Sequence, residues 1–170
     1  MRRPGNLSLI RVRIATRDGK FLAEYSAKGL ARLHFPGVVP TNAQAAPGRA
    51  AAVIRTWHSI TKAALKTVLA GRRPRTFPPL DLTAGTPFQQ IIWRALQEIP
   101  VRQTRSYGEI ARAIGKPKGV RAVGGACGAN PIPVLVPCHR VLAANGKLGG
   151  FSGGLDWKRR LLAREGLSPR

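Results

Sequence analysis

A cysteine and a histidine stand next to each other in a segment that favours thiol chemistry. Cys138 and His139 directly follow Pro137, which fixes the backbone, and apolar residues flank the group on both sides. A free thiol with a pKa of about 8.5 is only a few per cent thiolate near neutral pH, and a neighbouring imidazole or helix N-terminus lowers that pKa. Many cysteines are simply buried as small apolar side chains, but the ionisable neighbours of Cys138 favour a nucleophile.

The spacing of these residues limits how they can act together. Successive side chains of a strand point to opposite faces, so on an extended backbone His139 reaches Cys138 only through a turn or a bridging water. Metal binding by Cys127, Cys138 and His139 is disfavoured because their spacing matches no usual zinc motif. We therefore expect no metal and no cofactor.

The charge of the chain indicates a polyanionic partner. Its 170 residues include 29 Lys and Arg but only 7 Asp and Glu, which gives a formal net charge of +22. Such a potential attracts phosphates, so nucleic acid is the leading partner class. The basic residues are scattered from Arg2 to Arg170 and form no amphipathic or juxtamembrane block, which disfavours a membrane partner.

Three further features predict a cytoplasmic location. Residues 1–15 are basic but lack the apolar core of a secretory signal. No apolar run approaches the roughly 20 residues of a membrane-spanning helix. The chain has only two cysteines, too few for a disulfide framework, so free thiols in a reducing compartment are expected.

The first half of the chain predicts a small antiparallel sheet followed by a helix. Apolar and polar residues alternate over 8–14 and 21–25, with Asp18-Gly19 as a hairpin turn between them, and residues 30–35 read as a third strand. Residues 53–69 carry apolar residues at helical spacing and end before a glycine. The Arg- and Pro-rich residues 72–79 indicate a linker, which divides the chain into domains 1–79 and 80–170.

The second half predicts mainly helices. One begins at Thr86 and another at Ser106, each with Gln or Glu three residues later as in a capping box. A short helix rich in small residues follows over 120–128. Two short helices joined by a tight Gly/Pro turn in a basic chain suggest a helix-turn-helix that binds DNA. The fold class is therefore α/β, with a small N-terminal sheet plus helix and a mainly helical C-terminal domain.

Several motifs together resemble one protein family, the O6-alkylguanine-DNA alkyltransferases, also called methylated-DNA–protein-cysteine methyltransferases. The match extends over residues 80–165 in the family's order and spacing, whereas the N-terminal half matches only in its sheet-plus-helix plan. The matching segments are Leu80-Asp81-Leu82, Gly85-Thr86-Pro87-Phe88-Gln89, Trp93, Ser106-Tyr107-Gly108-Glu109-Ile110-Ala111, Arg121-Ala122-Val123-Gly124-Gly125-Ala126, Asn130-Pro131, Pro137-Cys138-His139-Arg140-Val141, Ser152-Gly153-Gly154 and Leu161-Leu162-Ala163-Arg164-Glu165.

The resemblance implies a role for each of these positions. Cys138 accepts the alkyl group, and His139, Glu165 and an intervening water form the relay that removes the thiol proton. Asn130 braces the turn that holds Cys138. The remaining positions meet the DNA: Tyr107 offers its hydroxyl to the flipped base, Val141, Phe151 and Ser152 line the base pocket, Arg121 enters the duplex in place of the extruded nucleotide, and Gly124 and Gly125 let the helix approach DNA closely.

The implied chemistry agrees with these residue types. Displacement at a saturated carbon needs a soft nucleophile, and the thioether that forms is too stable to be expelled, so one molecule repairs one lesion. The lesion must leave the base stack first. The expected partner is double-stranded DNA containing O6-alkylguanine, bound by a monomer. O4-alkylthymine as a second substrate and cooperative assembly on DNA are both left open.

The sequence departs from the family pattern at three positions. Arg102 stands where glycine is common, Phe151 stands where many members have tyrosine, and Cys127 is an additional thiol that we expect to be buried and inert. Two other functions fit part of the pattern. A non-catalytic helix-turn-helix protein would need no reactive Cys138, and a cysteine hydrolase would leave the basic charge and Arg121 unexplained.

Overall fold

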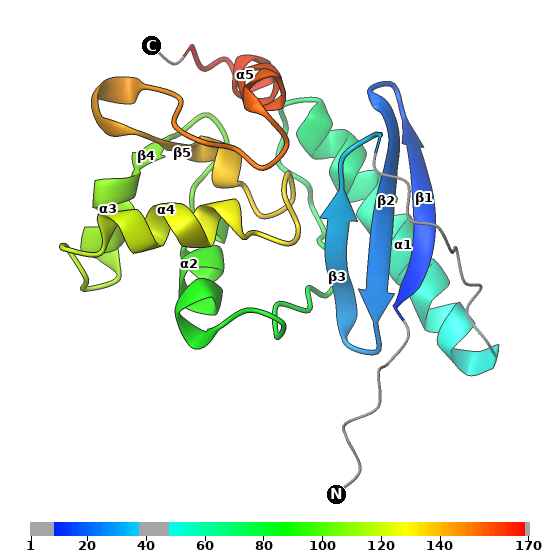
Figure 1. The fold of residues 1–170 in the computed structure, drawn as a ribbon. Coiled ribbons are helices and arrows are strands. Elements are labelled where there is room, and N and C mark those ends of the chain that lie inside the picture. Colours follow the sequence, from blue (N-terminus) through cyan, green and yellow to red (C-terminus); the bar gives the residue numbers. More distant parts are fainter. Residues whose placement is uncertain (1–8, 38–47, 169–170) are drawn as a thin grey trace, which may run out of the picture.

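The protein is described here from a computed structural model, which defines residues 9–37 and 48–168. The expectation that residues 1–15 are no secretory signal lies mostly outside this part of the chain. Three strands and a long helix occupy one end of the molecule, and four shorter helices occupy the other (Figure 1). No helix in the described part is long and apolar enough to span a membrane.

The N-terminal sheet confirms the predicted strands. β1 (Ile10–Thr16), β2 (Gly19–Ser26) and β3 (Gly29–His34) are antiparallel and lie in sequence order. The first turn lies one residue earlier than expected, because Thr16 pairs with Gly19 and leaves Arg17 and Asp18 as the loop. Gly19 begins β2 with a φ of 113°, a backbone conformation that favours glycine.

The helix α1 (Gly48–Leu69) packs its apolar side on this sheet. Ile54, Leu65 and Leu69 are buried and belong to the same apolar cluster as the inward side chains of the strands. Gly71 follows the helix end by two residues; its φ is 70°, and a Cβ there would lie 1.9 Å from the carbonyl oxygen of Arg164. This glycine therefore ends the helix and also lets the C-terminal part of the chain approach it.

The apolar core continues across the predicted domain boundary near residue 80. Leu30 of β3 forms a parallel bridge with Leu80, and the Leu33 amide donates to the carbonyl of Pro131 at 2.9 Å. Phe35, after β3, contacts the rings of Phe151 and Trp157. The two halves are thus packed on each other, and the boundary at residue 80 stays a prediction.

Short helices form the C-terminal half. α2 (Pro87–Gln97) and α3 (Tyr107–Ala113) each begin with the predicted capping box, and α4 (Val120–Gly128) packs against both. A two-residue strand β4 (Arg105–Ser106) pairs in parallel with β5 (Val141–Leu142). Single 3-10 turns lie at Cys138–Arg140 (η1) and Ala144–Gly146 (η2), and α5 (Leu155–Arg164) closes the fold. The use of the α3–α4 pair as a DNA-reading helix-turn-helix stays a proposal.

Candidate functional site

The segment that carries Cys138 is a tight turn and not a strand. Cys138–Arg140 forms a 3-10 turn in which the Cys138 amide donates to the Val136 carbonyl at 2.8 Å. Val134, four residues earlier, has a φ of 75°, which is strained for a β-branched residue. Successive side chains point to opposite faces only on an extended backbone, so this restriction does not apply to Cys138 and His139.

Asn130 holds this turn in place. Its Nδ2 donates to the Val136 carbonyl at 2.8 Å and to the Sγ of Cys138 at 3.1 Å, while its Oδ1 accepts from the Ile132 amide at 3.0 Å. Asn130 is 5% exposed, so each of these bonds forms away from water. One side chain thus fixes the segment that leads into the turn and the position of the thiol.

The thiol itself is protonated at neutral pH. Burial raises the pKa of Cys138 to about 11, although the Asn130 hydrogen bond and the nearby positive charge of Lys158 act to lower it. The sequence had favoured a lowered pKa of Cys138, an expectation that assumed a neighbouring imidazole or helix N-terminus. Because the folded protein does not hold a thiolate, any reaction of Cys138 needs a base that takes its proton.

His139 and Glu165 form a buried pair directly behind the turn. His139 Nε2 lies 3.0 Å from Oε1 of Glu165, and the two side chains are 0% and 1% exposed. Burial lowers the pKa of His139, which keeps the imidazole neutral, and an ionised Glu165 can only accept a hydrogen bond. The Nε2–H therefore donates to Glu165, which leaves the lone pair on Nδ1, a buried atom with no hydrogen-bond partner among the described residues.

Glu165 is held ionised by a second partner that the sequence analysis did not single out. Arg140 donates to both carboxylate oxygens, with Nε at 3.0 Å from Oε2 and Nη2 at 2.9 Å from Oε1, and its Nη1 donates to the carbonyl of Ile99. Against the cost of burial, hydrogen bonds from His139 and Arg140 lower the pKa of Glu165 to about 2. Glu165 is therefore a buried carboxylate that keeps its negative charge.

The unusual Arg102 also contacts this carboxylate. Its backbone amide donates to Oε2 of Glu165 at 3.2 Å, and its φ of 67° lies in the left-handed region. This conformation explains why glycine suits the position in related sequences. The turn at residue 102 therefore keeps its backbone conformation although arginine replaces the glycine of the family pattern. The Arg102 side chain is exposed at the surface.

A cavity of about 490 Å³, the acceptor cavity, opens in front of the thiol. It brings together four of the residues that the resemblance assigned to the base pocket or the acceptor, namely Cys138, Tyr107, Phe151 and Ser152. Val141 is not part of its lining and lies fully buried. The complete lining is Tyr107, Gly124, Cys127, Gly128, Cys138, Gly150, Phe151 and Ser152.

The second thiol shares this cavity with the first. Burial raises the pKa of Cys127 to about 12, and the two cysteines are both unbonded. Burial also raises the pKa of Tyr107, so its phenol keeps the proton. Cys138 differs from Cys127 in having the Asn130 hydrogen bond and a neighbouring His–Glu pair. The acceptor role therefore fits Cys138 better than Cys127.

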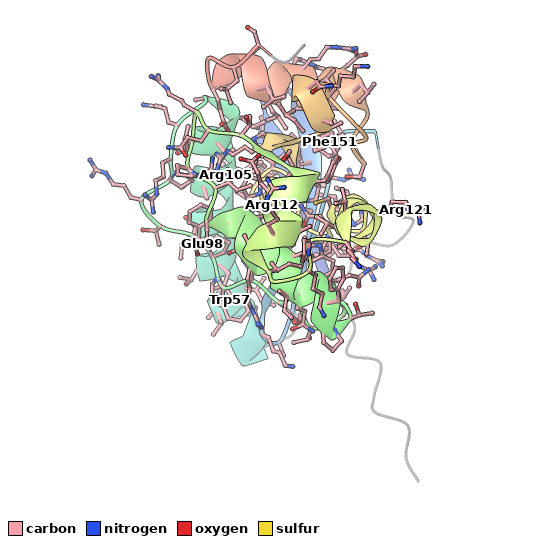
Figure 2. The ribbon with its side chains drawn as sticks, turned by 90° about the vertical axis from the view of Figure 1, so that its left-hand side faces the viewer. Trp57, Glu98, Arg105, Arg112, Arg121 and Phe151 are labelled. Carbon is pink, nitrogen blue, oxygen red and sulfur yellow. The ribbon has the colours of Figure 1, made fainter. Side chains whose placement is uncertain are left out.

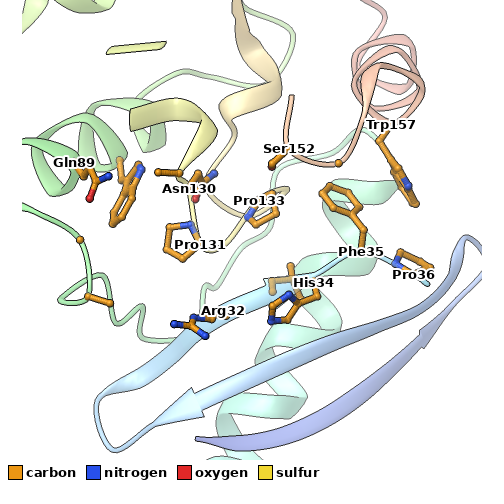
Figure 3. A pocket seen from close by; sticks show the side chains of 16 residues that line it. Arg32, His34, Phe35, Pro36, Gln89, Asn130, Pro131, Pro133, Ser152 and Trp157 are labelled. Atoms are coloured by element: carbon orange, nitrogen blue, oxygen red, sulfur yellow. The ribbon is translucent and has the colours of Figure 1, made fainter. Parts of the chain in front are cut away.

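A larger cavity of about 600 Å³ lies on the other side of Asn130, between β3 and the C-terminal half. Figure 3 shows Asn130 and Pro131 on one wall and Arg32 and His34 on the opposite wall. This cavity does not include Cys138, so we assign the functional site to the smaller one.

Lys158 is a buried charged residue beside the candidate site that the sequence analysis did not single out. It is 0% exposed, and its Nζ donates to the carbonyls of Val141 at 2.7 Å, Gly150 at 3.2 Å and Leu148. Burial lowers its pKa to about 8. These bonds tie α5 to the loop 141–150, which ends at the acceptor cavity. Lys158 lies three, four and seven residues before Leu161, Leu162 and Glu165, which places it on the buried face of α5. This spacing was the sequence signal that could have predicted its burial.

We expect the substitution Lys158→Met to loosen this loop. Three carbonyls would lose their charged donor, so the free energy of unfolding should fall on the order of 1–3 kcal/mol. Thermal unfolding and limited proteolysis of residues 141–150 measure the two effects. Arg159→Met is the matched control, because Arg159 is exposed. Equal behaviour of the two variants would show that the Lys158 contacts do not order the loop.

The three residues expected to contact the duplex itself, Arg121, Gly124 and Gly125, lie on α4. Arg121 is exposed and projects outward from this helix (Figure 2). A Cβ added at Gly124 or Gly125 would meet nothing within 4 Å. Close packing against another helix therefore does not explain these glycines, although each costs about 1 kcal/mol in a helix interior relative to alanine. Gly124 instead lines the acceptor cavity.

Part of the chain matches a family model and named relatives in sequence. The model described as 6-O-methylguanine DNA methyltransferase, DNA binding domain, matches residues 87–167. The methylated-DNA–protein-cysteine methyltransferase of Mycolicibacterium paratuberculosis is 62% identical over 86 residues, which are 51% of this chain and 52% of that protein. The chain thus matches about half the length of its curated relatives.

Solved structures match nearly the whole chain. The crystal structure of Mycobacterium tuberculosis OGT in complex with DNA has a TM-score of 0.72 and 40% identity, and the match covers 90% of both chains. The crystal structure of Mycobacterium tuberculosis O6-methylguanine methyltransferase has a TM-score of 0.73 and 36% identity over 95% of this chain and 96% of that chain. The similarity includes the sheet as well as the helices, and the chain belongs to the methylated-DNA–protein-cysteine methyltransferase family.

Proposed function

We propose that this protein repairs DNA by transferring the alkyl group of O6-alkylguanine onto its own Cys138, once per molecule. The observation that carries the proposal is the position of Cys138. Its thiol lies at the wall of the acceptor cavity, is bonded to Asn130, and has the buried His139–Glu165 pair behind it. Relatives and structural neighbours with the same activity in their names support it.

The proposed reaction is a displacement at the alkyl carbon. A bond forms between this carbon and Sγ of Cys138, and the bond to O6 breaks with its electron pair on the guanine. The guanine anion takes one proton from water, which restores the neutral base and balances the proton that leaves the thiol. The thiol proton passes through a water to Nδ1 of His139, and Glu165 stabilises the imidazolium that results. Because the pKa of Cys138 is raised, the proton leaves only when this base is in place. The thioether product is stable, so the protein does not turn over.

The proposed substrate is double-stranded DNA with the lesion turned out of the stack. A stacked base cannot reach a cavity that lies beside α4, so extrusion, at a cost of a few kcal/mol, must precede transfer. Tyr107 is placed to offer its hydroxyl to the base, and Phe151 and Ser152 line the cavity on the opposite loop. The open face of Gly124 and Gly125 lets DNA approach.

One copy of the chain is sufficient for this reaction. Cys138, Asn130, His139 and Glu165 all come from a single protomer, so we propose a monomer as the acting form. The two free thiols suit the reducing cytoplasm, which we propose as its location.

The site of alkylation tests this assignment. Both cysteines fall in one tryptic peptide, Ala122–Arg140. After incubation with methylated duplex, fragmentation of this peptide should therefore place the added methyl group on Cys138. A methyl group found on Cys127 would make Cys127 the acceptor and would overturn the assignment.

Arg121→Ala is expected to slow repair in duplex DNA much more than transfer from free O6-benzylguanine. If Arg121 fills the gap left by the flipped base, its loss matters only where a stack must be opened. Arg121→Lys should restore part of the duplex rate through charge and length but without planar stacking. Single-turnover rate constants on both substrates measure the effect. Equal losses on both substrates would mean that Arg121 supports the fold or the pocket.

A further inference from the structure

The positive charge of the chain is not concentrated on the helices proposed to bind DNA. No Asp or Glu occurs between Glu24 and Asp81, whereas nine Lys and Arg residues do. This segment forms β3, α1 and the chain that leads to residue 80. The proposed mechanism uses none of these basic residues.

Three of them form a stripe along one face of α1, which we call the α1 stripe. Arg55, Lys62 and Lys66 are spaced by seven and four residues, which places them within about 20° of one line along the helix. All three are exposed, and within the described residues no ion pair or side-chain hydrogen bond involves them. At a rise of about 1.5 Å per residue the stripe is about 16 Å long.

A groove of about 470 Å³ runs beside the stripe. Its lining includes Ala63 and Thr67, the helix neighbours of Lys62 and Lys66, and on the other side Arg72 and Arg75. These two arginines are exposed as well. Basic side chains therefore stand along both sides of a groove that contains no acidic residue.

We propose that the α1 stripe and the groove beside it form a second surface for the DNA backbone, contacting a different stretch of duplex from the one on α4. One strand of B-DNA carries a phosphate every 3.4 Å along the axis, so a 16 Å stripe faces about five of them. In Figure 1, α1 runs behind the strands at one end of the molecule, and α3 and α4 lie at the other. This inference rests on the proposed function in one respect, namely that the polyanion bound by the α1 stripe is DNA.

The apolar side of α1 argues against a membrane as the partner. An interfacial helix must insert its apolar face into the lipid. In α1 this face is buried on the sheet, with Ile54, Leu65 and Leu69 at most 6% exposed. The exposed face carries mainly basic, small and hydroxyl side chains, which suit phosphates in an aqueous setting.

Binding of undamaged duplex at several salt concentrations tests this surface. The variant R55Q/K62Q/K66Q is compared with R13Q/K20Q/K28Q, which removes the same charge from exposed positions on the sheet strands and their turn. Each lost phosphate contact makes the slope of log affinity against log salt less steep by about 0.9. The slope of the stripe variant should therefore be less steep than that of the wild type by about two to three, and the slope of the control variant by less than about one. Equal slopes for the two variants would overturn the proposal.

A capture assay tests whether the second duplex is a separate one. Wild-type protein bound to an immobilised lesion duplex should retain a labelled undamaged duplex, the control variant should do the same, and the stripe variant should lose most of this retention. No capture by the wild type would overturn the proposal. The proposal would also be overturned if the stripe variant lost binding to phosphatidylserine vesicles while the salt dependence of its DNA affinity stayed that of the wild type.

Transfer from free O6-benzylguanine separates this inference from the proposed function. The reaction needs Cys138 but no DNA, so both triple variants should react at the wild-type rate. A wild-type protein that fails to react would contradict the proposed function, and the salt slopes would still report on the α1 stripe.

Discussion

Replacing Cys138 with serine is expected to abolish alkyl transfer and to leave duplex affinity within a few-fold of the wild type. A hydroxyl is a harder and far weaker nucleophile at a saturated carbon than a thiol. The side chain is 4% exposed and contributes little contact area, so binding should change little. Transfer is followed by labelled alkyl groups on the protein, and affinity by titration of lesion duplex.

Cys127→Ala is the matched control for this substitution. It removes the other thiol of the acceptor cavity and leaves the Asn130 hydrogen bond and the His139–Glu165 pair in place. This variant should transfer the alkyl group at close to the wild-type rate. Transfer that persists in Cys138→Ser, or that disappears in Cys127→Ala, would move the acceptor to Cys127.

Glu165→Gln is expected to reduce the transfer rate on the order of 10²–10³-fold and to destabilise the fold. A neutral amide cannot stabilise the His139 imidazolium, and positioned general bases contribute about 10²–10⁴ to a rate. The substitution also leaves Arg140 buried without a counter-charge, which typically costs about 3–5 kcal/mol. Single-turnover rates well below the unfolding temperature separate the catalytic loss from the loss of stability.

Arg140→Met separates the two roles of Glu165. This variant breaks the Arg140–Glu165 ion pair but keeps the hydrogen bond from His139. It should therefore be destabilised like Glu165→Gln and yet retain more of the transfer rate. Equal rate losses in the two folded variants would show that Glu165 acts only through the structure of the turn.

The pH dependence of stability gives a further test of the buried carboxylate. The pKa of Glu165 is about 2 in the fold, against an ordinary value of 4.5. A lowered pKa stabilises the fold above pH 4.5, and this contribution is lost as the pH falls from 4.5 towards 2. The difference in unfolding free energy between wild type and Glu165→Gln should therefore shrink over this range. A constant difference would mean that Glu165 is not ionised in the fold.

The fold could be predicted where local signals decide it. The Thr86–Gln89 and Ser106–Glu109 capping boxes fixed the starts of α2 and α3, and alternating residues identified the strands. The conformation at Cys138 could not be read in this way. It depends on hydrogen bonds from Asn130, eight residues away, and on the left-handed backbone of Val134.

The candidate site was predicted in part. The resemblance supplied Cys138, His139 and Glu165, which the structure brings together. It did not supply the burial of Arg140 and Lys158, because charged residues normally indicate a solvent-exposed face. The partner of Arg140 is a carboxylate 25 residues away, a contact that leaves no local pattern. The partners of Lys158 are three loop carbonyls, and the one local signal for its burial was its position on the buried face of α5.

The intact mass of the protein after incubation with duplex DNA containing O6-methylguanine tests the central claim most directly. With lesion in excess, each molecule should gain the mass of one methylene, and the amount of repaired guanine should equal the amount of protein and then stop rising. An unchanged mass, or repair that continues beyond one lesion per molecule, would contradict irreversible transfer to Cys138.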